Sequence, residues 1–403
     1  MKAVMYGGGN IGRGFIGAVL SRSGYEVVFI DVVDSVVESL NARREYPVRL
    51  VSDKGHEDIM IKNVRAVNGR DRDAVAAEIA DADVMATAVG ANILKFIAPN
   101  IAAGISRRFD AGDRPLNIII CENLMDADKI LGGLIKENLS DEERRLFDER
   151  IGLVEASIGR MVPVQTDEMK DGDPLRVCVE KYGYLPVDKA AFKGGEPSIE
   201  GMVPFEPFDF FIKRKLYIHN MGHAICAYLG MYEKIDYICD AVAVPEIYAI
   251  AENAMLQSAE AMAKKYGQSM DGLMRHIYDL LNRFSNRALL DTCERVGRDQ
   301  KRKLAKDDRL VGAAELAVSM GITPSYICVG IAGALYKYCS ENGIELTGES
   351  GARVFAELSG IPADSTTGSL AMELFDAFIA GRPVREIMRL AEQQRAATAK
   401  DVI

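Results

Sequence analysis

The sequence contains no apolar run that approaches the roughly 20 residues needed for a membrane helix, so no membrane-spanning segment is expected. Its opening MKAVMYGGG is too polar and too rich in glycine for a secretory signal peptide. Low-complexity stretches are also missing, and 48% apolar with 27% charged residues is typical of a globular chain. We therefore expect a globular protein of the cytoplasm.

Cysteine pairs at metal-binding or redox spacing are missing as well. The seven cysteines are scattered, their number is odd, and none forms a CxxC motif. Disulfides and a structural zinc site are therefore not expected, and buried free thiols explain these residues. Only four histidines are present, and two of them, His219 and His223, lie close together in the sequence.

Positive charge is in deficit, which gives a net charge of −10 at neutral pH. A diffuse acidic surface repels nucleic acids and anionic membranes, so neither is expected as a partner. An anionic substrate would need a local basic pocket in such a protein. We expect a monomer or a weak homo-oligomer.

The first half alternates short β-branched runs with helical patterns. This alternation is typical of a parallel sheet covered on both faces, and it predicts an α/β, Rossmann-like, doubly wound domain. The predicted strands are 3–6, 27–30, 83–88 and 117–121, with helices at 10–23 and 33–43 and further strands at 151–157 and 175–181 that would extend the sheet.

The second half has a different texture, because from about residue 205 the chain reads as successive amphipathic helices. A turn-rich stretch at 193–198 separates the halves, and 403 residues are enough for two cores. We predict a dinucleotide-binding domain at 1–198 and a mainly α-helical catalytic domain at 199–403. The predicted helices are 205–230, 243–266, 269–284, 309–320, 325–341, 367–380 and 384–397.

A glycine-rich motif follows the first predicted strand. It fits G-x-G-x-x-G, with Gly7, Gly9 and Gly12 at the marked positions. In this context the first glycine permits a tight turn, the second lets a pyrophosphate approach the backbone, and the third lets helix and strand pack closely. Asn10 and Ile11 complete the loop and open a helix whose N-terminus would face the phosphates. The motif predicts binding of NAD.

Polar residues follow the ends of other predicted strands. Asp31 ends the second strand 19 residues after Gly12, close to the roughly 20 expected for an acid that binds the adenosine ribose. A carboxylate there repels a 2′-phosphate and favours NAD over NADP. Thr87 and Val89 end another strand, where the nicotinamide ribose would lie. Asn123 ends the next and is a site candidate, although capping the following helix explains it equally well.

The predicted helix at 205–230 carries a cluster of polar residues. At about 100° per residue, Lys215, His219, His223 and Asn220 fall within about 140° of one another, and apolar side chains form a separate stripe. The plain alternative is a solvated polar face. A zinc site at His219 and His223 has suitable spacing, but no third ligand is evident.

These residues carry a family resemblance. The pattern Lys215-x4-Asn220-x2-His223, the opening GGGNIGRGF and the CEN at 121–123 resemble the polyol-specific long-chain dehydrogenases. The segment 283–304 resembles one branch of that family, the mannitol-1-phosphate 5-dehydrogenases. The resemblance runs from residue 1 to about 340. Gly8 departs from it, because the family usually has alanine there.

The resemblance implies a metal-free reaction that uses NAD. Lys215 would act as the general acid and base for the hydroxyl whose carbon loses hydride. Asn123 and Asn220 would donate hydrogen bonds to the reacting oxygen. His223 would hold the lysine or a substrate hydroxyl.

A dense basic run lies at 295–309. A solvated charged face is the usual explanation of such a run, and a sugar-phosphate pocket is the alternative that the resemblance favours. We assign substrate binding to Arg298, Arg302 and Lys303. The implied reaction interconverts mannitol 1-phosphate and fructose 6-phosphate. A hexuronate reductase, a free-polyol dehydrogenase and a non-catalytic NAD-binding regulator remain the alternatives.

Overall fold

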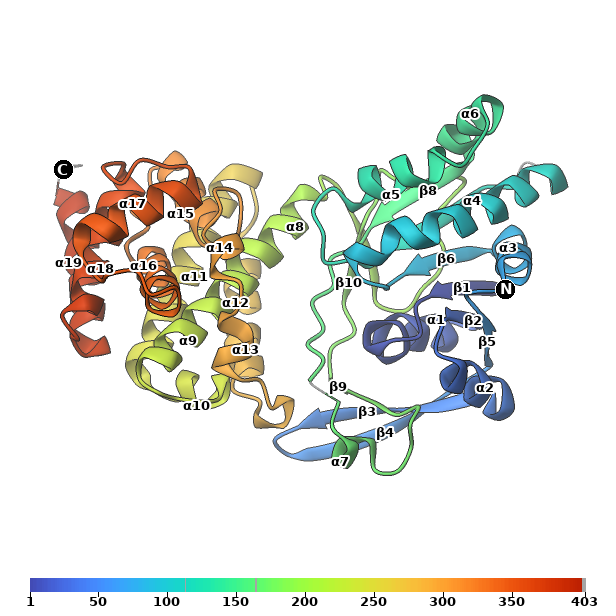
Figure 1. The fold of residues 1–403 in the computed structure, drawn as a ribbon, viewed down its shortest axis with the longest axis horizontal. Coiled ribbons are helices and arrows are strands. Elements are labelled where there is room, and N and C mark those ends of the chain that lie inside the picture. Colours follow the sequence, from blue (N-terminus) through green and yellow to red (C-terminus); the bar gives the residue numbers. More distant parts are fainter. Residues whose placement is uncertain (113, 164, 401–403) are drawn as a thin grey trace. The chain divides into compact units, whose positions relative to one another are not determined.

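The computed structural model describes residues 1–112, 114–163 and 165–400. The chain forms two compact units, Met1–Asp209 and Phe210–Ile403, called unit 1 and unit 2 below (Figure 1). The division comes later in the chain than the predicted boundary at residue 198, because one more short strand belongs to unit 1. Strand β11 (Met202–Phe205) pairs with β10 (Leu185–Asp188), so this segment belongs to unit 1.

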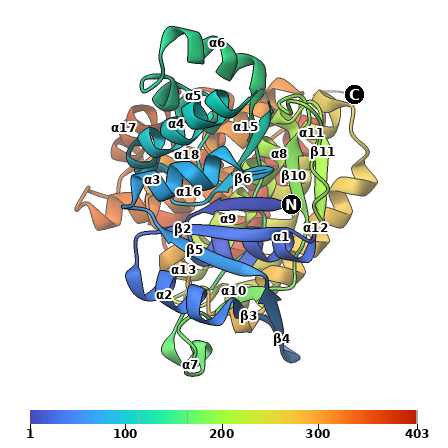
Figure 2. The same ribbon diagram turned by 90° about the vertical axis from the view of Figure 1, so that its right-hand side faces the viewer.

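Unit 1 is built on a parallel sheet of strand order β5-β2-β1-β6-β7-β8. Figure 2 shows β1, β2 and β5 side by side. The order reverses between β1 and β6, and ligands of such sheets bind at that point, outside the carboxyl ends of the strands. The predicted parallel sheet is confirmed, and β5 is a member that the sequence patterns did not reveal. The strands are β1 (Lys2–Tyr6), β2 (Glu26–Asp31), β5 (Val64–Asn68), β6 (Val84–Thr87), β7 (Leu116–Ile120) and β8 (Ile151–Glu155).

Helices cover both faces of this sheet (Figure 1). One apolar core packs Phe15 and Leu20 against Phe29, and the other packs Ile101 and Leu131 against Met85. Burial of both faces explains why the strands read as nearly continuous apolar runs. The helical segments are η1 (Gly12–Ile16), α1 (Gly17–Arg22), α2 (Asp34–Arg43), α3 (Arg72–Ala80), η2 (Ala91–Ile93), α4 (Leu94–Ala111), α5 (Ala127–Lys136) and α6 (Asp141–Arg150).

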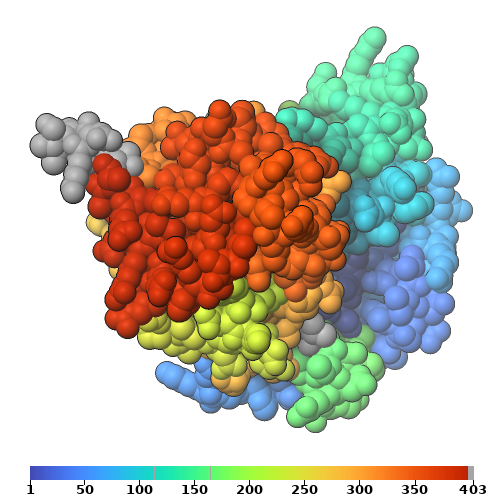
Figure 3. All heavy atoms as spheres, turned by 60° about the vertical axis from the view of Figure 1, so that its left-hand side comes forward, coloured from blue at the N-terminus to red at the C-terminus, as the bar shows by residue number. Residues whose placement is uncertain are grey.

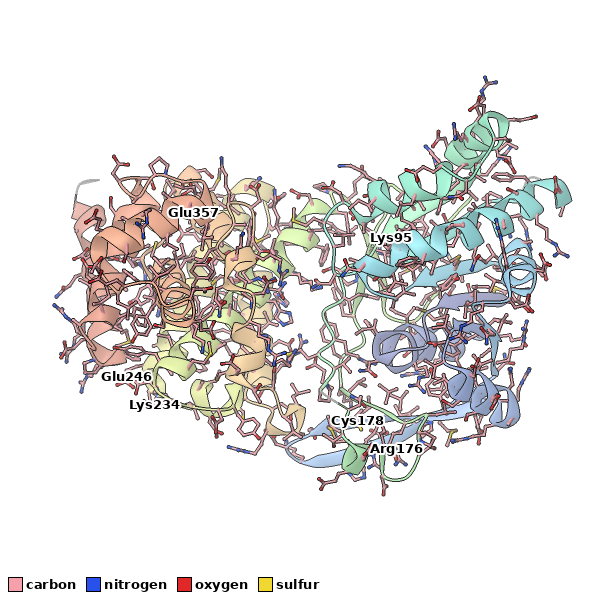
Figure 4. All side chains as sticks on the ribbon, viewed as in Figure 1. Lys95, Arg176, Cys178, Lys234, Glu246 and Glu357 are labelled. Carbon is pink, nitrogen blue, oxygen red and sulfur yellow. The ribbon has the colours of Figure 1, made fainter. Side chains whose placement is uncertain are left out.

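A second sheet of order β4-β3-β9 packs beside the first within unit 1. Its strands are β3 (Glu45–Ser52), β4 (Gly55–Lys62) and β9 (Val177–Glu180), and α7 (Asp167–Lys170) precedes β9. The expectation that this last strand extends the main sheet is wrong, because β9 pairs with β3. Arg176, labelled with Cys178 in Figure 4, lies 3.4 Å from Asp58 of β4 and ties the β3–β4 hairpin to the segment before β9.

Unit 2 is helical, as predicted, but the patterns did not reveal its helical segments at Ile238–Val242, Arg287–Leu289, Cys293–Gly297, Gln300–Lys303 and Gly348–Ser359. The helix predicted at 205–230 begins later, at Asp209, because β11 occupies the chain up to Phe205. Residues from about 350 to 397, red in Figure 3, gather on one face of the unit. The helical segments are α8 (Asp209–Arg214), η3 (Lys215–Asn220), α9 (Met221–Tyr232), α10 (Ile238–Val242), α11 (Pro245–Tyr266), α12 (Met270–Phe284), η4 (Arg287–Leu289), α13 (Cys293–Gly297), α14 (Gln300–Lys303), α15 (Val311–Ser319), α16 (Ser325–Glu341), α17 (Gly348–Ser359), α18 (Thr366–Ile379) and α19 (Val384–Lys400).

Helix α9 is the centre of unit 2, and α11, α13 and α16 pack around it. Its apolar stripe, which includes Ile225 and Leu229, is fully buried. Because η3 continues directly into α9, this packing fixes the residues of η3 in a rigid frame. Among the described helices of both units, none is long and apolar enough to cross a lipid bilayer.

Candidate active site

The glycine loop of unit 1 has the geometry that its sequence predicts. Gly7 has φ of 101° and donates its N–H to the carbonyl of Ile30 at 2.9 Å. A Cβ on Gly12 would lie 1.9 Å from the carbonyl oxygen of Gly7, so only glycine fits there. A Cβ on Gly9 would meet no atom within 4 Å. The loop is therefore tight where it packs on the strand and open where a pyrophosphate would approach.

The helix after the loop contains a π-turn that was not predicted. Helical structure begins at Asn10, as expected, but Gly12–Ile16 form a π-helical segment before α1 continues to Arg22. The N–H groups of a first helical turn have no partner within the helix, and they form a ready anion site. Asn10 is exposed and Ile11 half-buried at this end. These residues fit the phosphates of a dinucleotide.

Asp31 lies beside the loop, as the sequence predicts. Its Oδ2 accepts a hydrogen bond from the N–H of Gly8 at 2.8 Å, and its Oδ1 accepts one from Val33 at 2.9 Å. A Cβ on Gly8 would lie 2.9 Å from Oδ2, which gives a physical reason for glycine at this departure from the family pattern. A carboxylate has about four acceptor positions, so these two bonds leave capacity for ribose hydroxyls.

A buried carboxylate organises the loop after β6. Glu122 is 7% exposed and accepts hydrogen bonds from the N–H groups of Val89 at 2.9 Å and Gly90 at 2.8 Å. Thr87 is fully buried, so the accessible part of this strand end is the loop that begins at Ala88 and continues through Val89. Sequence reasoning included Glu122 only as part of the CEN string, and nothing in that string indicates which backbone it contacts.

Asn123 is exposed in the loop between β7 and α5. The alternative that it caps α5 is wrong, because the N-cap position belongs to Asp126. The first N–H of α5, from Ala127, is instead accepted by Oε1 of Glu155 at 2.9 Å. Burial, reinforced by the nearby Asp128, raises the pKa of Glu155 to about 7.

In unit 2, Lys215 and Asn220 lie at the two ends of a π-turn, η3. The constant rotation of about 100° per residue assumed for this helix is therefore wrong. A π-turn closes hydrogen bonds between residues five apart, so residues at positions i and i+5 come closer in rotation than in an α-helix. Lys215 and Asn220 have that spacing. Such turns occur frequently at functional sites.

Two imidazoles and an aromatic ring form a cluster, with His219 in η3, His223 in α9 and Phe284 at the end of α12. The ring of Phe284 stacks on His223, with centroids 4.7 Å apart and planes 10° apart, and His219 lies 6.2 Å from His223. Burial lowers the pKa of His219 well below its usual value, and the charges of Arg283, His223, His276 and Lys215 lower it further. His219 is therefore neutral at physiological pH. Phe284, at the end of α12, completes this cluster. In the sequence, this position stands out only because the segment 283–304 resembles the known family.

Asp291 is the functional candidate that sequence reasoning missed. Its Oδ2 lies 3.0 Å from Nε2 of His223, and its Oδ1 accepts a hydrogen bond from Nε of Arg295 at 2.9 Å. Burial alone would raise the pKa of Asp291, but the contacts with His223 and Arg295 outweigh it and lower the pKa. The carboxylate is therefore ionised at neutral pH. No helical or strand spacing connects residues 223 and 291, so no sequence pattern indicates this pair.

Across the described parts of both units, no group of three or more His, Cys, Asp or Glu side chains is arranged to hold a metal ion. His219 and His223 instead lie against the ring of Phe284, and the carboxylate near them, that of Asp291, contacts His223.

The basic segment separates into an internal and an external part. Lys303 is 4% exposed, and its ammonium donates hydrogen bonds to the carbonyls of Val296, at 2.6 Å, and Arg298. Burial, with the charges of Arg309 and Arg302, lowers the pKa of Lys303 to about 8. Lys303 thus holds the end of α13, which is a different role from the substrate contact expected for it.

The arginines of this segment differ in their pairing. Arg302 donates to Asp299 at 2.6 Å and Arg309 donates to Asp308 at 2.8 Å. The side chain of Arg298 is exposed and has no hydrogen bond or ion pair to any described residue. The hydroxyl of Tyr217, a residue of η3, donates to the carbonyl of Asp307 at 3.3 Å, so this part of the segment lies beside η3.

Comparisons with known proteins match both units. The model of the mannitol dehydrogenase Rossmann domain matches residues 1–201, and that of the mannitol dehydrogenase C-terminal domain matches 208–350. Mannitol-1-phosphate 5-dehydrogenase of Brevibacillus brevis is 37% identical over 98% of both chains. That of Bacillus licheniformis is 38% identical over 85% of this chain and 89% of its own.

A similar solved structure is Pseudomonas fluorescens mannitol 2-dehydrogenase in a ternary complex with NAD and D-mannitol. It has a TM-score of 0.76 at 14% identity and covers 96% of this chain and 93% of its own. The likeness shows a shared fold, in agreement with the α/β and helical units predicted from the sequence.

Proposed function

The chain belongs to the mannitol dehydrogenase family, and from that premise we propose that it interconverts mannitol 1-phosphate and fructose 6-phosphate with NAD. The observation that carries this proposal is the 37% identity to a mannitol-1-phosphate 5-dehydrogenase over 98% of both chains. We place the reaction in the cytoplasm, without a membrane or nucleic-acid partner, and expect a monomer or a weak homo-oligomer.

The glycine loop and Asp31 are the proposed holders of NAD. Gly9 leaves room for the pyrophosphate, the helix N-terminus at Asn10 and Ile11 faces it, and Asp31 accepts hydrogen bonds from the adenosine ribose. NAD supplies the hydride-accepting ring when it is bound. The negative charge of Asp31 disfavours the 2′-phosphate of NADP, so NAD is the proposed cofactor. Val89, fixed through Glu122, borders the loop assigned to the nicotinamide ribose.

Lys215 is the proposed general acid and base. In the oxidation, carbon 5 of mannitol 1-phosphate loses a hydride while its hydroxyl loses a proton, and Lys215 accepts that proton as a neutral amine. In the reduction it returns the proton to the developing alkoxide. Asn220 and Asn123 donate hydrogen bonds to the same oxygen, and such donors stabilise negative charge that develops in the transition state. His223 accepts a hydrogen bond from a substrate hydroxyl.

The exposed end of the basic segment is the proposed phosphate site. Arg298 carries a guanidinium without an acidic partner among the described residues, and Arg302 has one side engaged by Asp299. Planar guanidinium groups match phosphate oxygens in pairs. Lys303 supports this site from within by holding the carbonyl of Arg298. The phosphate would thereby keep the reacting carbon in register.

The test is a substrate panel followed by NADH absorbance. We expect rapid NAD reduction with mannitol 1-phosphate, rapid NADH oxidation with fructose 6-phosphate, and poor turnover of free mannitol. Equal rates with free mannitol would identify a free-polyol dehydrogenase, and preference for fructuronate or tagaturonate would identify a hexuronate reductase. NADH binding without turnover of any member of the panel would identify a regulator.

A further inference from the structure

We propose that Asp291 is a positioning residue for His223: its carboxylate keeps hydrogen on Nε2 of the imidazole and leaves Nδ1 as the ring's only acceptor. The proposal rests on the proposed function for the role of His223 in the reaction. The pairing of Asp291 with His223 does not depend on the proposed function, because it is a property of unit 2 alone.

The two oxygens of Asp291 have separate partners. Oδ1 accepts from Arg295, whose side chain is 46% exposed, whereas Oδ2 lies 3.0 Å from Nε2 of His223, in a contact between side chains that are only 10% and 14% exposed. Arg295 thus neutralises the carboxylate from the solvent side, and His223 meets it from the interior. The Nε2 atom is buried, and the N–H direction is not aligned with Oδ2. Polar contacts of this kind are often loosely aligned before substrate binds.

Both partners are held in place by other contacts. The stacked ring of Phe284 fixes the plane of the His223 imidazole. The backbone of Asp291 is fixed as well, because its carbonyl accepts from the N–H of Ile238 at 2.9 Å. The next turn begins at Thr292, whose hydroxyl accepts from the N–H of Arg295. The carboxylate is therefore a fixed reference for the imidazole edge, which a flexible surface acid would not be.

The chemistry of the pair determines the tautomer. The contacts with His223 and Arg295 lower the pKa of Asp291, so at neutral pH its carboxylate can only accept hydrogen bonds. The imidazole nitrogen that faces it must then carry hydrogen. In a neutral imidazole the other nitrogen has a lone pair, which suits acceptance from a substrate hydroxyl. Without the carboxylate of Asp291, hydrogen can occupy either nitrogen of the neutral imidazole. Only one of the two tautomers then leaves Nδ1 able to accept from the substrate hydroxyl.

The kinetic test is a double-mutant cycle with Asp291→Asn and His223→Asn. In the parent background, Asp291→Asn should lower kcat by about 10- to 100-fold, the value of a hydrogen bond to a charged group. The Kd for NADH should not change. In the His223→Asn background, the same change should alter kcat by no more than about twofold. Asp364→Asn, which removes an exposed carboxylate elsewhere in unit 2, is the matched control.

The second measurement observes the tautomer directly. The chain has four histidines, so the imidazole nitrogens of His223 are assigned by the signals that disappear in His223→Asn. At pH 8 the parent should show a protonated Nε2 and an unprotonated Nδ1, and Asp291→Asn should lose that preference. Asp291→Glu, which keeps the charge, should retain the tautomer and part of the activity.

Two results would overturn the proposal. One is an unchanged tautomer in Asp291→Asn, and the other is an equal kcat loss in both backgrounds, which would mean a purely structural role. If the parent turns over no sugar phosphate, the proposed function fails, but the nuclear magnetic resonance arm still decides whether Asp291 sets the tautomer.

Discussion

The candidate sites of the two units consist of different chemical groups. In unit 1 the site is largely backbone: glycines without side chains, the first N–H groups of a helix, and amides fixed by Asp31 and Glu122. In unit 2 it is made of side chains from η3, α9, the end of α12 and the segment before α13. A backbone site depends on shape and tolerates no added atoms, whereas a side-chain site depends on a few titratable groups. Substitutions should therefore fail in different ways in the two units.

The largest effect should come from Lys215→Ala in unit 2. General acid–base groups contribute about 10²- to 10⁴-fold, so kcat should fall by that factor while the Kd for NADH stays unchanged. Fluorescence titration of NADH and steady-state rates from pH 6 to about 10 measure the two quantities. Lys264→Ala, which removes a surface lysine paired with Glu260, is the control. A parent-like rate for Lys215→Ala across this range would eliminate Lys215 as the acid and base.

Gly9→Ala in unit 1 should have the opposite effect and weaken NADH binding. A Cβ at Gly9 meets nothing within 4 Å in the protein, so thermal stability should not fall. The same Cβ would overlap the pyrophosphate, and overpacking of about 1–3 kcal/mol corresponds to roughly 5- to 150-fold weaker NADH binding. Gly133→Ala on α5, which is equally open, should leave binding unchanged. Unaltered affinity in Gly9→Ala would place the dinucleotide elsewhere.

An intermediate effect is expected at the exposed cations of unit 2. Arg298→Ala should lower kcat/KM for mannitol 1-phosphate by about 10- to 100-fold, because hydrogen bonds to charged groups are worth about 1.5–3 kcal/mol. Arg302→Ala should cost less, since Asp299 already engages its guanidinium. Arg353→Ala on α17 serves as the control. Equal losses on mannitol 1-phosphate and free mannitol would assign the segment to the fold and not to the phosphate.

A smaller effect is expected from Asp31→Ser. Serine cannot repel the 2′-phosphate of NADP, so the ratio of kcat/KM for NAD to that for NADP should fall by about tenfold, in the range of one charged hydrogen bond. Serine also removes one of the two acceptors that hold Gly8 and Val33, so NAD affinity should decline as well. A parent enzyme that uses NADP as readily as NAD would contradict this assignment of Asp31.

The smallest effect concerns Glu155, which holds the first turn of α5. Its folded-state pKa is raised to about 7, so the stability that its neutral form contributes is complete below the ordinary carboxyl pKa and is lost as pH rises through 7. Glu155→Gln should therefore melt at a higher temperature than the parent at pH 8, with the difference shrinking towards pH 5. After allowance for solvent screening, we expect about 1 kcal/mol, or 2–4 °C. The control is Glu142→Gln on α6, and identical pH dependence in parent and Glu155→Gln would contradict the assignment.

Much of unit 1 could be predicted because its signals are contiguous. Strand, glycine loop and helix follow one another within residues 2–22, and Asp31 ends the next strand. The β3–β4 hairpin was missed because Gly55 and its neighbours are mostly exposed and show no clean alternation of apolar and polar residues. Its partner β9 was predicted as a strand but assigned to the wrong sheet, because sequence does not show which edge a strand joins.

The site of unit 2 was predicted only in part. Lys215, Asn220 and His223 share one helix, so the sequence pattern groups them, and the family resemblance supplies their expected roles. The π-turn could not be predicted, because no amino-acid pattern in this segment distinguishes it from an α-helix. Asp291 joins the site through a contact between segments far apart in sequence, and Lys303 is buried although lysine is usually exposed, because two carbonyls accept from it. Such contacts depend on how α13 packs against α9.

The central claim, that a hydride passes between NAD and the sugar phosphate under the control of these residues, is tested most directly by isotope transfer. NADH carrying deuterium on carbon 4 of the nicotinamide, in the transferred position, is incubated with fructose 6-phosphate and the parent enzyme, and the product is analysed by mass spectrometry. We predict mannitol 1-phosphate with one deuterium on the former carbonyl carbon, formed at least about 10²-fold more slowly by Lys215→Ala. A reduced product without deuterium, or no product while NADH binds normally, would contradict the account.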